Sequence, residues 1–174
     1  MKKNALIFFF LCVFANLYAQ HINFMGIPLG QTKDVTDHLL RQNGFKYEGY
    51  SGNGPLYKGD FWIYNGIRLR LTVEGRFVTA ITVEILDKKY KKKEEFNKLV
   101  NNLNSKYGKI YSKKNISQYF YFYYWKVKGG FISADYFLNE YKNFEGFSLS
   151  YIDYTNKTFE KPVVVKKRNK NNDL

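Results

Sequence analysis

The chain has almost none of the residue types on which thiol and metal chemistry depend. It has one cysteine, Cys12, and two histidines, His21 and His38, among 174 residues. Cys12 lies in an N-terminal apolar segment with the features of an export signal, so we expect the mature chain to have no cysteine, and therefore no disulfide or thiol nucleophile. No HExxH motif or histidine pair is present. We therefore expect neither a metal nor a cofactor.

Motifs of nucleophilic catalysis and phosphate binding are missing as well. No GxSxG elbow occurs, and the glycine-rich stretch 49–54 is not followed by GK[ST]. Four carboxylates fall on or near expected strands: Asp60, Glu84, Asp135 and Asp153. Two of them could act as a glycosidase pair, but nothing in their spacing selects two, and strand carboxylates often pair with neighbouring cations. We expect a protein that is not an enzyme, with an envelope-polymer hydrolase as the alternative.

The N-terminus predicts export. Lys2 and Lys3 precede an apolar run over residues 5–15, and Ala19 offers a cleavage point, with cleavage after Ala15 as the alternative. Residues 1–19 are therefore expected to be a signal peptide and the mature protein to be periplasmic or secreted. Residues 20–160 have the length of a single domain. Residues 161–174 form a basic, asparagine-rich tail that we expect to be flexible.

The charge of the chain is strongly positive, at +13. Outside the cytoplasm such a charge favours an anionic envelope component or an acidic protein as partner and makes nucleic acid an unexpected one. Peripheral membrane contact through the basic tail from Lys166 is a further hypothesis, and it would make the protein an envelope assembly or stability factor. A lysine-rich surface can also serve only to keep an aromatic-rich protein in solution.

Two helices are expected from the apolar spacing. Thr32 can cap a helix that ends near Asn43. A second helix is predicted by an apolar series at helical spacing, and it ends at Gly108. The members of this series are Phe96, Leu99, Val100, Leu103 and Tyr107.

The remaining sequence predicts strands. Residues 58–64, 67–73 and 77–85 are expected to form an antiparallel meander, with a hairpin turn at Asn65-Gly66. Alternation over 67–73 places Arg68 and Arg70 opposite the apolar side chains. Residues 131–138 and 146–154 are two further expected strands, and residues 113–117 are expected to form a polar turn.

Seven consecutive aromatic residues, 119–125, are the most apolar stretch of the expected domain. Aromatic side chains favour strands, and a strand alternates its faces. One face would carry Tyr119, Tyr121, Tyr123 and Trp125, and the other would carry Phe120, Phe122 and Tyr124. The sequence does not show which of these faces meets the helices.

Together these patterns predict an α+β fold in which two helices pack on one face of a twisted antiparallel sheet, as a two-layer sandwich. The order of a helix and then strands occurs twice. Trp62 is followed four residues later by Gly66, and Trp125 by Gly129. This echo raises the possibility that a helix-plus-three-strands unit has been duplicated.

Two segments resemble small exported proteins of Bacteroidetes-type bacteria. The first is the lead-in 24–30 with its helix and Gly44-Phe45, and the second is 96–109, which ends in Lys106-Tyr107-Gly108-Lys109. The resemblance implies two helices and one sheet. The layout is also similar, more loosely, to β-lactamase-inhibitor-like proteins and to small outer-membrane assembly lipoproteins, where a concave sheet binds a protein partner. The lipobox cysteine of the lipoproteins is missing here.

These expectations combine into a functional hypothesis. An exported, non-catalytic module would bind a protein, a peptide or an anionic envelope ligand on a sheet face that is both aromatic and basic. The expected binding residues are Arg68, Arg70, Tyr119, Tyr121, Tyr123 and Trp125, with Phe120, Phe122 and Tyr124 as the alternative aromatic set.

Overall fold

The computed structural model describes residues 22–52, 54–86, 92–117, 120–139 and 144–154. The expected signal peptide, the basic tail and Tyr119 lie outside the described residues. Within the described residues, no helix is both long and apolar enough to cross a membrane.

The elements follow one another as two similar series. After the short strands β1 (Asn23–Phe24) and β2 (Ile27–Pro28), the first series is α2 (Lys33–Gln42), β3 (Lys46–Ser51), β4 (Gly54–Phe61), β5 (Tyr64–Glu74) and β6 (Phe77–Ile85). The second series is α3 (Lys92–Tyr107), β7 (Ser112–Ser117), β8 (Phe120–Val127), β9 (Gly130–Asn139) and β10 (Phe144–Asp153). The α+β class is thereby confirmed. Each series has four strands after its helix, one more than the helix-plus-three-strands unit whose duplication the sequence suggested.

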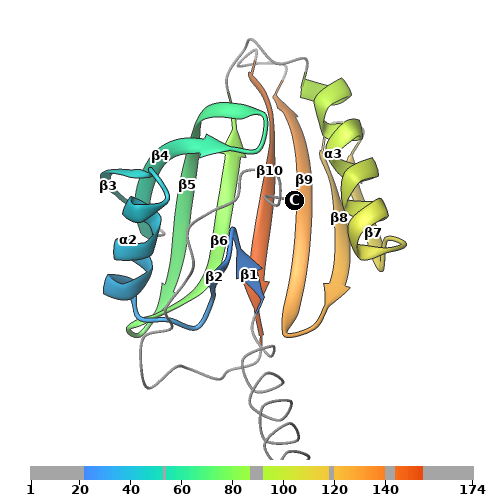
Figure 1. Cartoon of the computed structure of the whole chain (residues 1–174). Helices are drawn as coiled ribbons and strands as arrows, with labels where there is room; N and C mark the ends of the chain where they lie inside the picture. The colour runs from blue at the N-terminus through green and yellow to red at the C-terminus, as the bar shows by residue number, and fades with distance from the viewer. Residues whose placement is uncertain (1–21, 53, 87–91, 118–119, 140–143, 155–174) are drawn as a thin grey trace, which may run out of the picture.

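All eight of these strands form one antiparallel sheet in the order β3-β4-β5-β6-β10-β9-β8-β7 (Figure 1). Each series therefore forms half of the sheet from neighbours in sequence. The halves join where β6 pairs with β10, from Ile85 opposite Phe147 to Ala80 opposite Ile152.

The helices begin and end where the sequence predicted. Thr32 is extended and its hydroxyl accepts a bond from the backbone N–H of Val35, which caps α2. The start of α2 is also fixed to the turn between β5 and β6, because Lys33 N–H donates to the Arg76 carbonyl. In α3 the residues Phe96, Leu99 and Leu103 are fully buried, as their helical spacing requires.

The strand register separates the side chains of the sheet into two faces. One row runs across six strands as Tyr57, Leu69, Val83, Leu149, Ala134 and Tyr123, and we call its side the Leu69 face. The neighbouring row runs across seven strands as Lys58, Arg68, Glu84, Ser148, Asp135, Phe122 and Lys114, and we call its side the Arg68 face. The Leu69 face is apolar, and the Arg68 face is charged at one end and aromatic toward the other.

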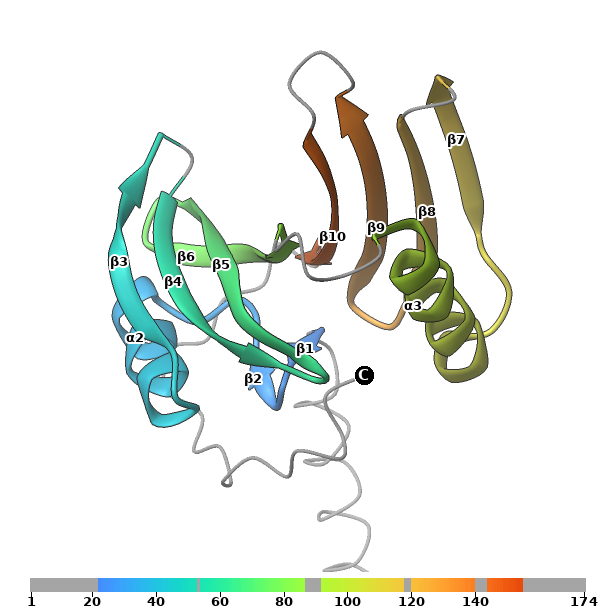
Figure 2. The ribbon, with the colours of Figure 1, turned by 90° about the horizontal axis from the view of Figure 1, so that it is seen from above.

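Both helices contact the Leu69 face. On α3, the Phe96 ring lies among four aromatic rings of β8, β9 and β10 at centroid distances of 5.6 to 5.9 Å: Tyr121, Tyr123, Tyr136 and Phe147. On α2, Asp37 accepts a hydrogen bond from the hydroxyl of Tyr57. The β1–β2 pair joins this side through Phe24, whose ring contacts Tyr151 at 5.4 Å. Seen from above, the outer strands curve away from the side on which the helices lie (Figure 2).

Two sequence predictions about turns are wrong. The chain reverses between β4 and β5 at Trp62-Ile63, with Phe61 opposite Tyr64, and Trp62 has a φ of 53°. Asn65-Gly66 lies instead in β5, beside an irregularity of the register. Residues 113–117, expected to be a turn, belong to β7, which pairs with β8.

Candidate functional site

Three residues of the predicted aromatic set, Tyr121, Tyr123 and Trp125, contact α3. Trp125 is fully buried, and its indole N–H donates to Oδ1 of Asn104 on α3 over 3.1 Å. The rings of Tyr121 and Tyr123 contact Phe96, also on α3. Trp125 is therefore part of the core, and Tyr121 and Tyr123 are partly buried against α3.

Arg68 and Arg70 lie on the opposite side of the sheet. They share the Arg68 face with Phe122 and Tyr124, because Phe122 is in the row of Arg68 and Tyr124 is in the row of Arg70. The expected grouping of the two arginines with Tyr121, Tyr123 and Trp125 is corrected by this register. The alternative aromatic set is the one that the fold places on their side.

The basic end of the Arg68 face is organised around Glu84. Arg70 Nη2 lies 2.5 Å from Glu84 Oε1, whereas Arg68 Nη1 lies 3.9 Å from Oε2. The Glu84 side chain is 14% exposed and the Arg68 side chain 48%. Arg70 therefore neutralises the carboxylate, and the Arg68 guanidinium remains accessible together with the exposed Lys58.

The middle of the Arg68 face is a network of hydroxyls. Thr82 and Ser150 are within 3.0 Å of one another, and Ser133 and Ser148 both donate to the carboxylate of Asp135. Burial raises the pKa of Asp135 above its ordinary value, and the two serine hydrogen bonds oppose that rise only in part. This floor is polar but already satisfied within the protein.

The aromatic end lies on β8 and β9. The rings of Phe120 and Phe122 are T-shaped at 4.7 Å, and those of Phe122 and Tyr124 are stacked at 6.1 Å. Phe137 contacts Phe120 at 6.5 Å. All four side chains keep part of their surface in solvent. The result is a partly exposed aromatic ladder facing the arginines across the polar floor.

The candidate catalytic carboxylates do not gather at one place. Glu84 and Asp135 are in one row with Ser148 between them, so two strand spacings, about 10 Å, separate their backbones. Asp60 accepts a bond from Gly66 N–H at the β4–β5 end, and Asp153 is the last residue of β10. Among the described residues, no group of three or more potential metal-ligating side chains occurs.

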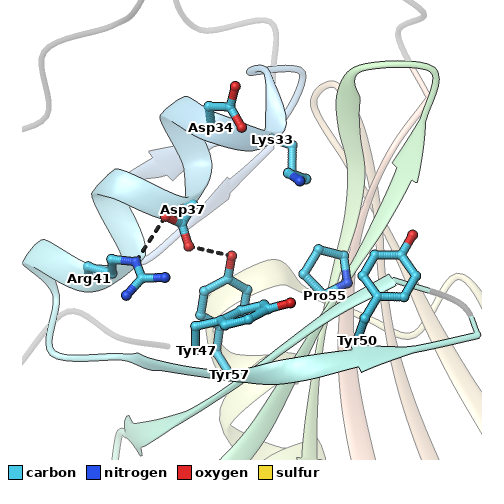
Figure 3. A pocket seen from close by; sticks show the side chains of 8 residues that line it. All are labelled: Lys33, Asp34, Asp37, Arg41, Tyr47, Tyr50, Pro55 and Tyr57. Carbon is cyan, nitrogen blue, oxygen red and sulfur yellow. Dashed lines mark hydrogen bonds and ion pairs between the residues drawn. The ribbon is translucent and has the colours of Figure 1, made fainter.

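A pocket of about 210 Å³ lies between α2 and the strands β3 and β4 (Figure 3). It was not anticipated from the sequence. We call it the Tyr50 pocket, and it is lined by Lys33, Asp34, Asp37, Arg41, Tyr47, Tyr50, Pro55 and Tyr57. Lys33, Asp37 and Arg41 are four residues apart and therefore lie on one side of α2.

A β-bulge brings the rings of this pocket together. Tyr47 pairs with Tyr57 and Tyr50 pairs with Pro55, with a register shift between Tyr47 and Gly49. Tyr50 is three positions after Tyr47, an odd number, so in a regular strand the two side chains would point to opposite faces. The extra residue restores them to the same face, because their partners are only two residues apart.

Asp37 is the centre of the polar half of the pocket. It accepts a bond of 2.7 Å from the Tyr57 hydroxyl and one of 2.9 Å from Arg41 Nε. Burial would raise the pKa of Asp37, but these two hydrogen bonds and the charges of Arg41 and Lys33 outweigh it and lower the pKa. The carboxylate is therefore ionised at neutral pH and fixed between helix and sheet.

The sequence carried one signal for this pocket, the spacing of Asp37 and Arg41 by four residues within the predicted helix. The contribution of Tyr47, Tyr50 and Tyr57 depends on the bulge, which no local pattern indicated. Comparison of the chain with models of known protein families, with curated proteins and with solved structures gave no match.

Proposed function

We propose that the protein is an exported binding module that holds an acidic segment of a partner protein on the Arg68 face. In this proposal α2 and α3 cover the Leu69 face as one layer, and the sheet is the second layer with its concave side open. The observation that carries the proposal is the register, which sets accessible cations at one end of the Arg68 face and a partly exposed aromatic ladder toward the other.

The dimensions of this face favour a protein over a small molecule. The row from Lys58 to Lys114 crosses seven strands, or about 30 Å at about 4.8 Å per strand. That width matches the footprint of a protein–protein interface of about 800 Å² per partner. Partly exposed aromatic rings and arginines are also the residues that contribute most of the binding energy at such interfaces.

Charge selects an acidic partner. Lys58, Arg68 and Lys114 are exposed on the row, and Arg70 already neutralises Glu84. An approaching carboxylate would meet Arg68, whose five N–H donors suit a bidentate contact. A cationic segment would be repelled. The export signal proposed from the sequence places this partner in the periplasm or outside the cell.

Charge reversal on the two sides of the sheet tests the proposal. The mature protein would be used to capture partners from envelope extract at low and high salt, with a photo-crosslinking amino acid at the position of Tyr124. The double variant K58E/R68E should lose about tenfold or more of the captured and crosslinked protein. The double variant K93E/K109E, which changes the net charge equally at exposed positions away from this face, should keep it.

Each alternative has its own outcome in this experiment. Equal loss in both double variants, together with capture that vanishes at high salt, would indicate unspecific attraction by net charge and overturn the proposal. Crosslinking from the position of Asn97 on α3 but not from that of Tyr124 would place the interface on the helices instead.

A hydrolase is the second candidate, and one observation favours it. Glu84 forms ion pairs with Arg68 and Arg70, whereas burial raises the pKa of Asp135 in the same row. An inverting glycosidase uses two carboxyls in different surroundings, about 6.5–9.5 Å apart. The backbones of Glu84 and Asp135 are about 10 Å apart, so their side chains would have to lean toward one another to act as such a pair. Release of soluble fragments from purified envelope polymer by the wild type, but not by Glu84→Gln or Asp135→Asn, would establish it.

A further inference from the structure

We propose that the Tyr50 pocket is a second binding site, and that it takes one neutral sugar ring. It lies on the α2 side of the sheet, and the Arg68 face is on the opposite side. The two sites can therefore be occupied independently. The proposal rests on three properties of the pocket: exposed aromatic rings, balanced charge, and a fixed pair of donors and acceptors.

The pocket has two exposed aromatic rings in its lining. Five large hydrophobic side chains are exposed among the described residues, and two of them, Tyr47 at 47% and Tyr50 at 66%, belong to its lining. Both rings are held by the bulged strand, and the Tyr47 ring packs against Tyr57 at 5.6 Å. Aromatic rings left in solvent offer a flat surface for the apolar C–H face of a sugar, and a tyrosine ring has few torsions to immobilise on binding.

The size of the pocket limits the ligand to a single ring. Its volume of about 210 Å³ is below the range of about 300–1,000 Å³ typical of sites for drug-sized ligands. The pocket is open on one side, so the ring can belong to the end of a longer glycan that continues into solvent.

The pocket lining has equal numbers of positive and negative side chains, which disfavours an ionic ligand of either sign. Lys33 and Arg41 are opposed by Asp34 and Asp37. An anion such as phosphate would be attracted by the two cations and repelled by the two carboxylates. A quaternary ammonium would be attracted by the carboxylates and repelled by the cations. In both cases the attraction and the repulsion largely cancel. A neutral polyhydroxyl ligand avoids both penalties.

Hydrogen-bonding groups complete the match. Arg41 uses Nε for Asp37 and its guanidinium lies 5.8 Å over the Tyr47 ring, which leaves the Nη groups as donors. Each Asp37 oxygen accepts one bond and has a further lone pair. Figure 3 shows the Asp37 carboxylate between the Tyr57 hydroxyl and the Arg41 guanidinium, which lies beside the rings. Adjacent donors and acceptors suit adjacent hydroxyls, since each hydroxyl both donates and accepts.

Saturation-transfer NMR on the full mature chain tests the proposal. The probes are D-mannose, D-galactose and N-acetyl-D-glucosamine at millimolar concentration, beside sodium phosphate, sodium glucuronate and choline chloride. At least one neutral sugar should give transfer from aromatic protons, and Tyr50→Ala should weaken its affinity about tenfold. Because Tyr50 is two-thirds exposed, this substitution should leave the circular dichroism and the denaturation midpoint unchanged.

The matched control is Tyr111→Ala, which removes another exposed tyrosine, 64% accessible, directly before β7 and far from the pocket in the strand order. It should bind the same sugar as the wild type does. Asp37→Asn should also weaken binding, because the amide has one acceptor oxygen where the carboxylate has two. Equal binding by Tyr50→Ala and wild type, no transfer to any neutral sugar, or stronger binding of phosphate, glucuronate or choline would each overturn the proposal. None of these outcomes depends on the partner of the Arg68 face.

Discussion

Trp125 donates its indole N–H to Oδ1 of Asn104 over 3.1 Å, and this bond joins the aromatic strand β8 to α3. Trp125 is fully buried, so water cannot replace the acceptor. The bond explains why the most aromatic strand of the chain turns this side toward the helix. A polar group inside an otherwise apolar contact fixes how helix and strand are aligned, because any sliding of α3 would leave the N–H unpaired.

Removal of that acceptor should be costly. Asn104→Ala leaves a buried N–H without a partner, and we expect the free energy of unfolding to fall by about 1–3 kcal/mol. Asn101→Ala, at an exposed position of the same helix, should change it by less than about 0.5 kcal/mol. Urea denaturation followed by tryptophan fluorescence measures both, and equal effects would show that the indole bond contributes nothing specific.

The Phe96 ring should be the most sensitive side chain of α3. It contacts Tyr121, Tyr123, Tyr136 and Phe147 and is fully buried. We expect Phe96→Ala to destabilise the protein by about 3–5 kcal/mol, since it leaves a cavity among four rings. Thermal denaturation would show this as a large fall in Tm. Ile63→Ala, at a side chain that is 52% exposed, is the control and should have a small effect.

Gly130 should not tolerate a side chain. A Cβ at this position would lie 2.0 Å from the backbone carbonyl oxygen of Ile152, which cannot move without distorting β10. We expect Gly130→Ala to cost about 1–3 kcal/mol or more through strain. At Gly52 a Cβ would meet nothing within 4 Å. Gly52→Ala should therefore stay within about 1 kcal/mol of the wild type, and a similar loss in both variants would contradict the clash.

Asp135 should make stability fall as pH rises. Burial raises its pKa in the folded state above the unfolded value of 3.8, so the folded state binds the proton more tightly. The stability that this proton confers is present below the unfolded pKa and is lost as pH rises through the folded pKa. Asp135→Asn removes this dependence. The variant should gain stability relative to the wild type as pH rises from 4 to about 7, as denaturation midpoints would show.

The pH dependence of stability that Asp37 contributes should have the opposite sign to that of Asp135, so Asp37 serves as the comparison. Its pKa is lowered in the folded state, so its stabilising effect is present above 3.8 and is lost as pH falls through the folded pKa. Asp37→Asn should therefore cost more stability at neutral pH than in acid. If both variants differed from the wild type by the same amount at every pH, neither carboxylate would be coupled to folding as inferred.

Where one side of an element is apolar and the other polar, the sequence predicted the structure well. The alternation of Ile67, Leu69 and Leu71 with Arg68 and Arg70 determined both faces of β5. The apolar spacing of α3 determined its buried side. Residues 120–125 carry aromatic side chains on both faces, so alternation could not show which set would meet α3. That choice depended on Phe96 and Asn104, which lie elsewhere in the chain.

The misplaced elements have a common cause, which is that pairing across the sheet overrides local turn preference. Asn65-Gly66 has the composition of a hairpin turn, but Phe61 pairs with Tyr64 and moves the reversal to Trp62-Ile63. The echo of Trp62 and Trp125 likewise does not match equivalent places, because Trp62 lies in a turn and Trp125 in a buried strand position. The Tyr50 pocket depends on the bulge after Tyr47, which has no sequence signature.

The strand order has one more consequence, for how this sheet can meet other chains. Since β6 and β10 pair with each other, the edges of the eight-stranded sheet, among the described residues, are β3 and β7, the first strand of each half. The exposed side chains there include Lys46 and Glu48 on β3 and Lys113 and Lys114 on β7. Charges on edge strands oppose the addition of another strand, so they protect the sheet from growing into an aggregate. For the proposed partner, binding to the side chains of a face is therefore favoured over addition of a strand.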